Sequence, residues 1–157
     1  MSDVAPIPDG FHTLAPHLVV HDAAAAIEFY RRAFGALELF RIASPDGELI
    51  LYSELQVGES RLMLCDEVPD SDRWRPPKLL GGTSVTIHFW TDDCDAAFRR
   101  AVDAGAQVSM PLRDAFWGDR YGKVTDPFGH EWAIATHTKD LTPMEIAAAV
   151  AESFSKS

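Results

Sequence analysis

Two histidines and a glutamate have the residue types and the positions for shared chemistry. His17 lies in the strand-like segment Leu14–Val20, His88 lies 71 residues further on in the strand-like segment Val85–Thr91, and Glu131 begins a later strand. Imidazole nitrogens and carboxylate oxygens are common ligands of divalent metals. These residues are therefore a candidate metal site, in which Glu131 could also act as a general base. In the alternative, the histidines hydrogen-bond each other or a ligand, or line a cleft that holds no metal.

Side-chain alternation along the predicted strands extends this set. Successive strand residues point to opposite faces, so Leu62 and Leu64 mark the apolar face of one strand, and Ile87 and Phe89 mark that of another. The opposite faces are mixed and point inward, which favours a ligand cleft. Cys65 has no base beside it in the sequence and is expected to line this cleft rather than act as a nucleophile. Ten residues are predicted to contact a ligand there: His17, Arg61, Met63, Cys65, Thr86, His88, Trp90, Trp117, Tyr121 and Glu131.

The segment Phe116–Gly122 resembles a loop, because it contains two glycines and the polar residues Asp119 and Arg120. Its aromatic rings suggest a second role besides core packing. A loop that exposes Trp117 could close over a flat or cationic ligand through stacking and cation–π contacts.

A degenerate internal repeat organises these elements. Each copy contains a strand, a helix that begins after an Asp N-cap, and a glycine that ends the helix. The N-caps are Asp22 and Asp93, and the terminating glycines are Gly35 and Gly105.

Three short β-prone segments follow each helix. The simplest description is two βαβββ modules, an α+β fold class in which a curved mixed sheet surrounds a cleft. The β-prone segments are Leu37–Ala43, Glu48–Val57 and Ser60–Asp66 in the first half, and Gln107–Pro111, Gly122–Thr125 and Glu131–Thr136 in the second.

The modules belong to one predicted domain, residues 10–140, with module 1 at about 10–67, a linker at 68–82 and module 2 at about 83–138. Residues 141–157 are predicted to form a C-terminal helix, because Thr142-Pro-Met-Glu145 is a capping box. This helix is expected either to dock on the domain surface or to contact a second copy in a dimer.

Composition narrows the function classes. The chain has 157 residues, with 14 basic against 24 acidic side chains and a net charge of −10, and it has no Lys/Arg cluster. Nucleic acid and anionic membranes are therefore not expected partners. Without a signal sequence or a transmembrane segment, and with only Cys65 and Cys94, the sequence favours a reduced, cytoplasmic protein.

The sequence also resembles a known superfamily. The segments Phe29-Tyr-Arg-Arg-Ala-Phe-Gly35 and Asp126-Pro-Phe-Gly-His130, within two βαβββ modules, are similar to those of vicinal oxygen chelate proteins: glyoxalases, extradiol dioxygenases, and fosfomycin- and bleomycin-resistance proteins. Residues 10–20, 116–122 and 141–145 look like the PhnB-like branch. The resemblance implies the fold strongly and the function weakly.

Enzymes of this superfamily hold one divalent metal with four inward strand residues. Carried over by position, those sites fall on Ala15, Met63, Thr86 and Ala133, of which only Thr86 offers an oxygen ligand. The resemblance therefore implies that the usual metal site is absent.

Three functions remain in view. The first is a metal-free, bleomycin-resistance-like homodimer that binds a small cationic or aromatic molecule between modules, with no cofactor. The second is a divalent-metal-dependent lyase, isomerase or epimerase of glyoxalase type, with a displaced site at His17, His88 and Glu131 and with Glu131 as the base. The third is a domain that binds an unknown metabolite or serves chiefly for dimerisation.

Overall fold

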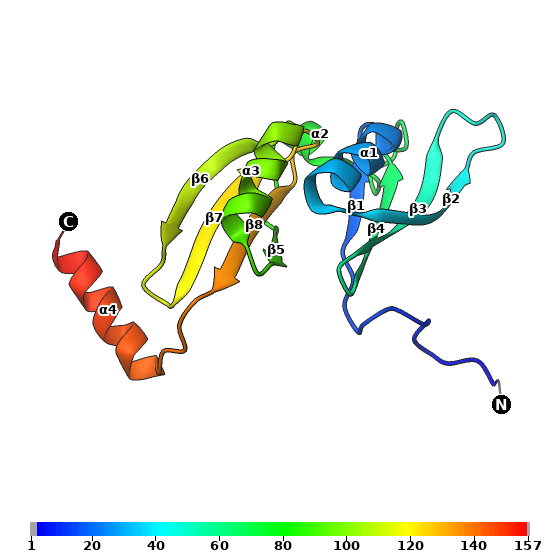
Figure 1. Cartoon of the computed structure of the whole chain (residues 1–157). Coiled ribbons are helices and arrows are strands. Elements are labelled where there is room, and N and C mark those ends of the chain that lie inside the picture. Colours follow the sequence, from blue (N-terminus) through cyan, green and yellow to red (C-terminus); the bar gives the residue numbers. More distant parts are fainter. Residues whose placement is uncertain (1–2, 157) are drawn as a thin grey trace.

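The computed structural model describes residues 3–156 and contains two modules of the predicted kind (Figure 1). The first consists of β1 (His17–Val20), α1 (Ala23–Phe34), β2 (Leu37–Ala43), β3 (Ile50–Val57) and β4 (Ser60–Asp66). The second consists of β5 (Thr86–Trp90), α3 (Cys94–Ala104), β6 (Gln107–Asp114), β7 (Asp119–Thr125) and β8 (Glu131–His137). A short helix, α2 (Pro77–Leu80), lies in the linker, and α4 (Pro143–Ser155) follows the second module. The α+β fold class is confirmed.

The helix boundaries follow the predicted caps. The Asp22 carboxylate accepts a hydrogen bond from the backbone N–H of Ala25, and Asp93 accepts one from Ala96, which satisfies an amide at the start of each helix. α1 ends at Gly35, whose φ of 67° lies in the left-handed region that favours glycine.

Each module forms its own four-stranded mixed sheet. Sheet 1 has the strand order β1-β4-β3-β2 and sheet 2 the order β5-β8-β7-β6, with β1–β4 and β5–β8 parallel and the other pairs antiparallel. Figure 1 shows α1 and α3 on the same side of the molecule, and these two helices pack against each other. Within residues 3–156, no strand pairing joins the two sheets.

An aromatic core joins the modules. Phe34 from α1 stacks on Trp132 from β8, with 4.3 Å between ring centroids, and the fully buried Tyr30 lies against the same indole. Burial of such large rings is the main source of stabilisation at a contact of this kind.

Asp126 ties the same region together with hydrogen bonds. One carboxylate oxygen accepts from the Tyr30 hydroxyl at 2.5 Å and from Trp132 Nε1 at 2.9 Å. The other accepts from the backbone N–H groups of Phe128 and His130, both at 2.9 Å. Asp126 therefore caps its own turn, as its Asp-Pro-Phe-Gly context predicts, and also links α1 to the second module.

Several sequence expectations at the strand ends are wrong. Leu14 and Val85 were expected to begin the strand-like segments Leu14–Val20 and Val85–Thr91, but both precede the strands and are highly exposed. The strand predicted at Gln107–Pro111 continues to Asp114, because β6 keeps pairing with β7 beyond a register shift that accommodates Pro111.

The predicted loop Phe116–Gly122 is also mostly strand. β7 begins at Asp119, which is buried, so only the turn before it is irregular. The C-terminal helix forms and has the predicted capping box at Thr142, but none of its described residues is buried, so it is not docked on its own domain. No helix among residues 3–156 is long and apolar enough to span a membrane.

Candidate functional site

The faces of both sheets that point away from α1 and α3, here called the inner faces, carry the predicted site residues. In sheet 1, the parallel register places His17 beside Met63 and Val19 beside Cys65, while Leu18 and its neighbours on the opposite face are buried. The predicted residues His17, Arg61, Met63 and Cys65 therefore share the inner face of sheet 1.

In sheet 2, the inner face has a floor of small side chains with aromatic rings beside it. His88 pairs with Ala133, and both Trp90 and Tyr121 pair with Ala135. The centroid of the His88 ring lies 4.3 Å from that of Trp90 and 5.9 Å from that of Tyr121. Ala133 and Ala135 are fully buried beneath these rings, whereas Trp90 is 56% exposed and offers a ring face on which a flat molecule can stack. We call His88, Trp90 and Tyr121 the aromatic row.

Two cavities lie where the modules meet. One, of about 510 Å³, is lined by residues that include His17, Thr86, His88 and His130. The other, of about 400 Å³, is lined by residues that include Arg61, His88 and Trp90. His17 and His88 therefore open onto one cavity, as their equal places in the repeat suggested.

The other predicted residues lie elsewhere within a single chain. Glu131 lines a third cavity, of about 550 Å³, with Lys78 and Lys123. Trp117 lines a fourth, of about 460 Å³, with residues of the β6–β7 turn and Phe154. The structure thus places the ten predicted residues on two inner faces but does not gather them around one cavity of the chain.

The pKa values of three inner-face groups are shifted in the direction that favours the uncharged form. Partial loss of solvation lowers the pKa of His17 and of His88, although Asp119 opposes the shift at His88. Burial, and then the nearby Asp66, raises the pKa of the Cys65 thiol. Neutral imidazoles can donate and accept hydrogen bonds, whereas a protonated thiol is a poor nucleophile.

Glu131 is held by its neighbours rather than presented to a substrate. The Thr125 hydroxyl donates to one carboxylate oxygen, the Ser109 hydroxyl donates to the other at 3.0 Å, and Lys123 Nζ lies 3.5 Å from that second oxygen. These three contacts hold the Glu131 carboxylate against β6 and β7.

The donor set does not fit the metal of the superfamily. Among residues 3–156, no three His, Cys, Asp or Glu side chains lie close enough together to hold a metal ion, so His17, His88 and Glu131 are not assembled in one chain. In the strand register, Met63 pairs with His17, and the buried Ala133 pairs with His88. We therefore derive no chemical step through a metal.

Trp117 is fixed by a hydrogen-bonded chain that sequence reasoning missed. Its indole Nε1 donates to the buried Asp119 at 2.7 Å, and the other Asp119 oxygen contacts His137 Nδ1 at 2.7 Å. His137 Nε2 in turn lies 2.8 Å from Asp140. The hydrogen bond to Asp119 is the main cause that raises the pKa of His137. Asp119 and His137 occupy paired positions of β7 and β8, a register that the sequence does not specify.

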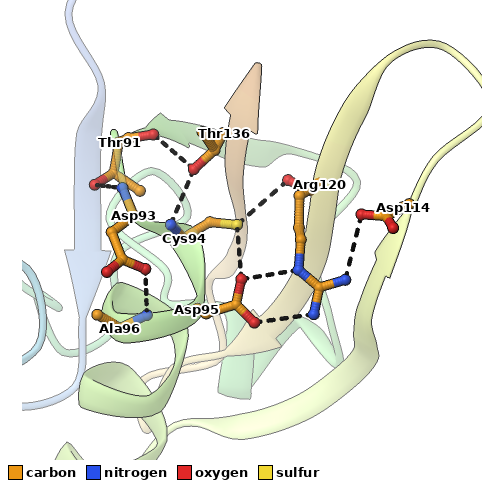
Figure 2. Close-up of polar contacts among 8 residues, drawn as sticks. All are labelled: Thr91, Asp93, Cys94, Asp95, Ala96, Asp114, Arg120 and Thr136. Atoms are coloured by element: carbon orange, nitrogen blue, oxygen red, sulfur yellow. Dashed lines mark hydrogen bonds and ion pairs between the residues drawn. The ribbon is translucent and has the colours of Figure 1, made fainter. Parts of the chain in front are cut away.

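Arg120 was expected to be exposed in the loop, but it is engaged on the opposite side of sheet 2 (Figure 2). Its guanidinium donates two hydrogen bonds to Asp95 of α3, at 2.8 and 2.9 Å, and a longer one to Asp114. Cys94 Sγ lies beside the Asp95 carboxylate and the Arg120 carbonyl oxygen. Arg120 therefore fastens α3 to the sheet and does not belong to a lid.

Arg61 is covered by the N-terminal segment. Its Nε lies 3.3 Å from Glu54, and both side chains are largely buried. The Phe11 ring lies over the guanidinium, and a side chain at Gly10 would overlap it. Glu54 pairs with Met63 across β3 and β4, so strand alternation could have identified it as a further inner-face residue.

Comparisons with known proteins identify one protein family. A family model described as the glyoxalase/bleomycin resistance protein/dioxygenase superfamily matches residues 10–134. A Mycobacterium tuberculosis protein described as uncharacterized is 49% identical over 139 residues, which cover 87% of this chain and 81% of that protein. An uncharacterized Arabidopsis thaliana protein is 38% identical over 124 residues, covering 74% of this chain and 73% of its own.

Solved structures of related proteins have the same fold. TioX from Micromonospora sp. ML1 aligns with a TM-score of 0.63 at 28% identity, over 80% of this chain and 98% of TioX. A PhnB protein from Bacillus cereus aligns with a TM-score of 0.62 over 80% of this chain and 99% of its own, but at 13% identity, so it supports the fold alone.

Proposed function

Because the chain belongs to the glyoxalase/bleomycin resistance protein/dioxygenase superfamily, we propose that it binds a flat aromatic small molecule, without a metal, on the inner faces of its sheets. The observation that carries this proposal is the aromatic row beside Ala133 and Ala135. Stacking between rings contributes about 0.5–1.5 kcal/mol beyond the burial of apolar area.

Charge supports a ligand that is neutral or cationic. The chain carries a net charge of −10, which attracts cations over long range. Among the groups of the aromatic row, His88 is neutral near pH 7 because its pKa is lowered. A positively charged aromatic ring would therefore not be repelled by a positive charge on His88 and could form cation–π contacts with Trp90.

The same groups favour binding over turnover. The pKa of the Cys65 thiol is raised, and Glu131 is held by Thr125, Ser109 and Lys123. Neither residue has the geometry of an activated nucleophile or base. No observation favours the glyoxalase-type lyase or isomerase over binding alone.

We propose further that the ligand cleft is completed in a homodimer. Trp90 and Phe40 are 56% and 47% exposed on the inner faces of sheets 2 and 1, so both offer apolar area that a partner could bury. A second copy that set its sheet 1 against sheet 2 of the first would cover both faces. The cleft would then contain all ten predicted residues, six from one copy and four from its partner.

Two finer assignments complete the proposal. Placement in the PhnB-like branch is supported by the segments Phe116–Gly122 and Leu141–Glu145. A cytoplasmic location is supported by Cys65 and Cys94, which are unpaired thiols.

The test compares two planar probes of opposite charge, 9-aminoacridine and 9-anthracenecarboxylate, by isothermal calorimetry. We expect the cation to bind more tightly, and we expect Trp90→Ala to weaken its binding by roughly tenfold, from lost stacking and apolar burial. Leu80→Ala, an exposed substitution in α2, is the matched control and should bind like the wild type. Failure of both probes to bind, or equal binding by Trp90→Ala, would overturn the proposal.

A further inference from the structure

The C-terminal helix α4 presents an apolar stripe that its own chain does not cover. Ile146 and Val150 are half-buried, whereas Met144 and Phe154 are 83% and 78% exposed. Met144, Ala147, Ala151 and Phe154 recur at the spacing of one helical face. This outward stripe has large residues at both ends and alanines between them.

The attachment of α4 to the domain is well defined. The Gly118 carbonyl accepts hydrogen bonds from the backbone N–H groups of Thr138 and Lys139 and from the Thr138 hydroxyl, all at 2.9 Å. The segment before α4 is therefore fastened to the β6–β7 turn, and the capping box at Thr142 sets where the helix begins. An anchored, capped helix with an uncovered apolar stripe is typical of a docking element.

A second uncovered apolar surface lies at the far edge of sheet 1. Leu37, Phe40 and Ile42 of β2 pair with inner-face residues of β3, and their exposed fractions are 63%, 47% and 51%. β2 is an edge strand, with no neighbour on its outer side in the described chain. A long, apolar edge strand without cover is prone to association. We call these three residues the β2 strip.

The two surfaces match in length but cannot meet within one chain. The 13 residues of α4 span about 20 Å, and the seven residues of β2 span about 23 Å. Figure 1 places α4 beyond sheet 2, at the opposite end of the molecule from β2. The alanines of the outward stripe would leave space for the protruding Phe40 ring.

A membrane is a poor alternative occupant for the outward stripe. Helices that bind membrane surfaces carry Lys and Arg on the polar face, but Pro143–Ser155 contains two glutamates and no basic residue. The net charge of −10 also opposes contact with anionic lipid. A second copy, by contrast, offers the complementary strip and receives the same contact in return, as two-fold symmetry requires.

We propose that α4 packs its outward stripe on the β2 strip of a second copy, so that two reciprocal helix–strand contacts fasten the dimer. This inference rests on the homodimer of the proposed function but not on its ligand. Each copy then covers the apolar edge of its partner.

The test is disulfide cross-linking between chains that carry one added cysteine each. Ala147→Cys in α4 and Phe40→Cys in β2 are made on separate chains and refolded together, so that a bond between them must join two molecules. Native Cys65 and Cys94 are buried and stay in every variant. The matched controls are Glu152→Cys, on the charged side of α4, and Arg41→Cys, which follows Phe40 but points to the other face of β2.

We expect a cross-linked dimer from Ala147→Cys with Phe40→Cys, and much less from either control pair. We also expect the chain shortened to residues 1–140 to dissociate at concentrations where the full chain sediments as a dimer. A dimer without the specific cross-link would overturn the role of α4 and leave the proposed cleft intact. A full chain that sediments as a monomer would overturn both, whereas cross-linking without probe binding would refute only the ligand proposal.

Discussion

Among the polar side chains, removal of the Asp126 carboxylate is expected to reduce the stability of the protein most. This residue is 4% exposed and accepts four hydrogen bonds, from the Tyr30 hydroxyl, Trp132 Nε1 and two backbone N–H groups. Burial and the neighbouring carboxylate raise the pKa of Tyr30, so its hydroxyl is a hydrogen-bond donor near neutral pH. Replacement of Asp126 by alanine removes the acceptor and leaves all four donors in place.

The loss can be worked out from these contacts. Each buried donor left without a partner costs about 1–3 kcal/mol, and the two backbone N–H groups of the turn can recover part of this by hydration. We expect Asp126→Ala to lower the free energy of unfolding by about 3–5 kcal/mol. Tyr30→Phe removes one donor to a charged group and should cost about 1.5–3 kcal/mol.

Urea unfolding followed by tryptophan fluorescence measures both losses. Asp72→Ala, a substitution of an exposed carboxylate in the linker, should change stability by less than about 0.5 kcal/mol. In the double variant, the cost of Tyr30→Phe should largely disappear, because its acceptor is already gone. A loss below about 1 kcal/mol for Asp126→Ala, or full additivity with Tyr30→Phe, would refute the claim that this carboxylate links the modules.

Two further predictions concern titratable groups. The pKa of His137 is raised above 6.5, mainly by Asp119, so its stabilising contribution is fully present below about pH 6.5 and is lost as pH rises through the raised value. The difference in Tm between wild type and His137→Gln should therefore be larger at about pH 5.5 than at about pH 9, and a difference that grows toward high pH would contradict this. Burial and a raised pKa should make Cys65 react with a maleimide far more slowly in the folded chain than in urea; equal rates would show that the thiol is accessible.

The modular architecture was predictable because its signals are local. Asp22, Asp93 and Gly35 form caps whose geometry depends on a few neighbouring residues, and the structure has each of them. The inner-face residues of both sheets followed from strand alternation, since the period of two is a property of the backbone. Alternation assigned His17 and His88 correctly without any knowledge of which strands pair.

What the sequence did not predict depends on contacts between distant segments. The pairing of β6 with β7 extends the strands into the expected loop, so Asp119 becomes buried and Arg120 reaches Asp95. The hydrogen bonds that link Trp117, Asp119 and His137 depend on the β7–β8 register. Side-chain alternation does not specify this register, because a shift by two residues keeps every side chain on the same face. The exposed position of α4 is likewise a tertiary property, because its apolar residues suit an intramolecular contact as well as an intermolecular one.

The most direct test of the central claim is a calorimetric titration of chelator-treated protein with 9-aminoacridine. The proposed metal-free aromatic cleft predicts saturable binding at one molecule per chain, with Trp90→Ala clearly weakened and added Zn²⁺, Mn²⁺ or Ni²⁺ without effect. Binding that appears only after metal is restored, or that persists unchanged in Trp90→Ala, would contradict the account.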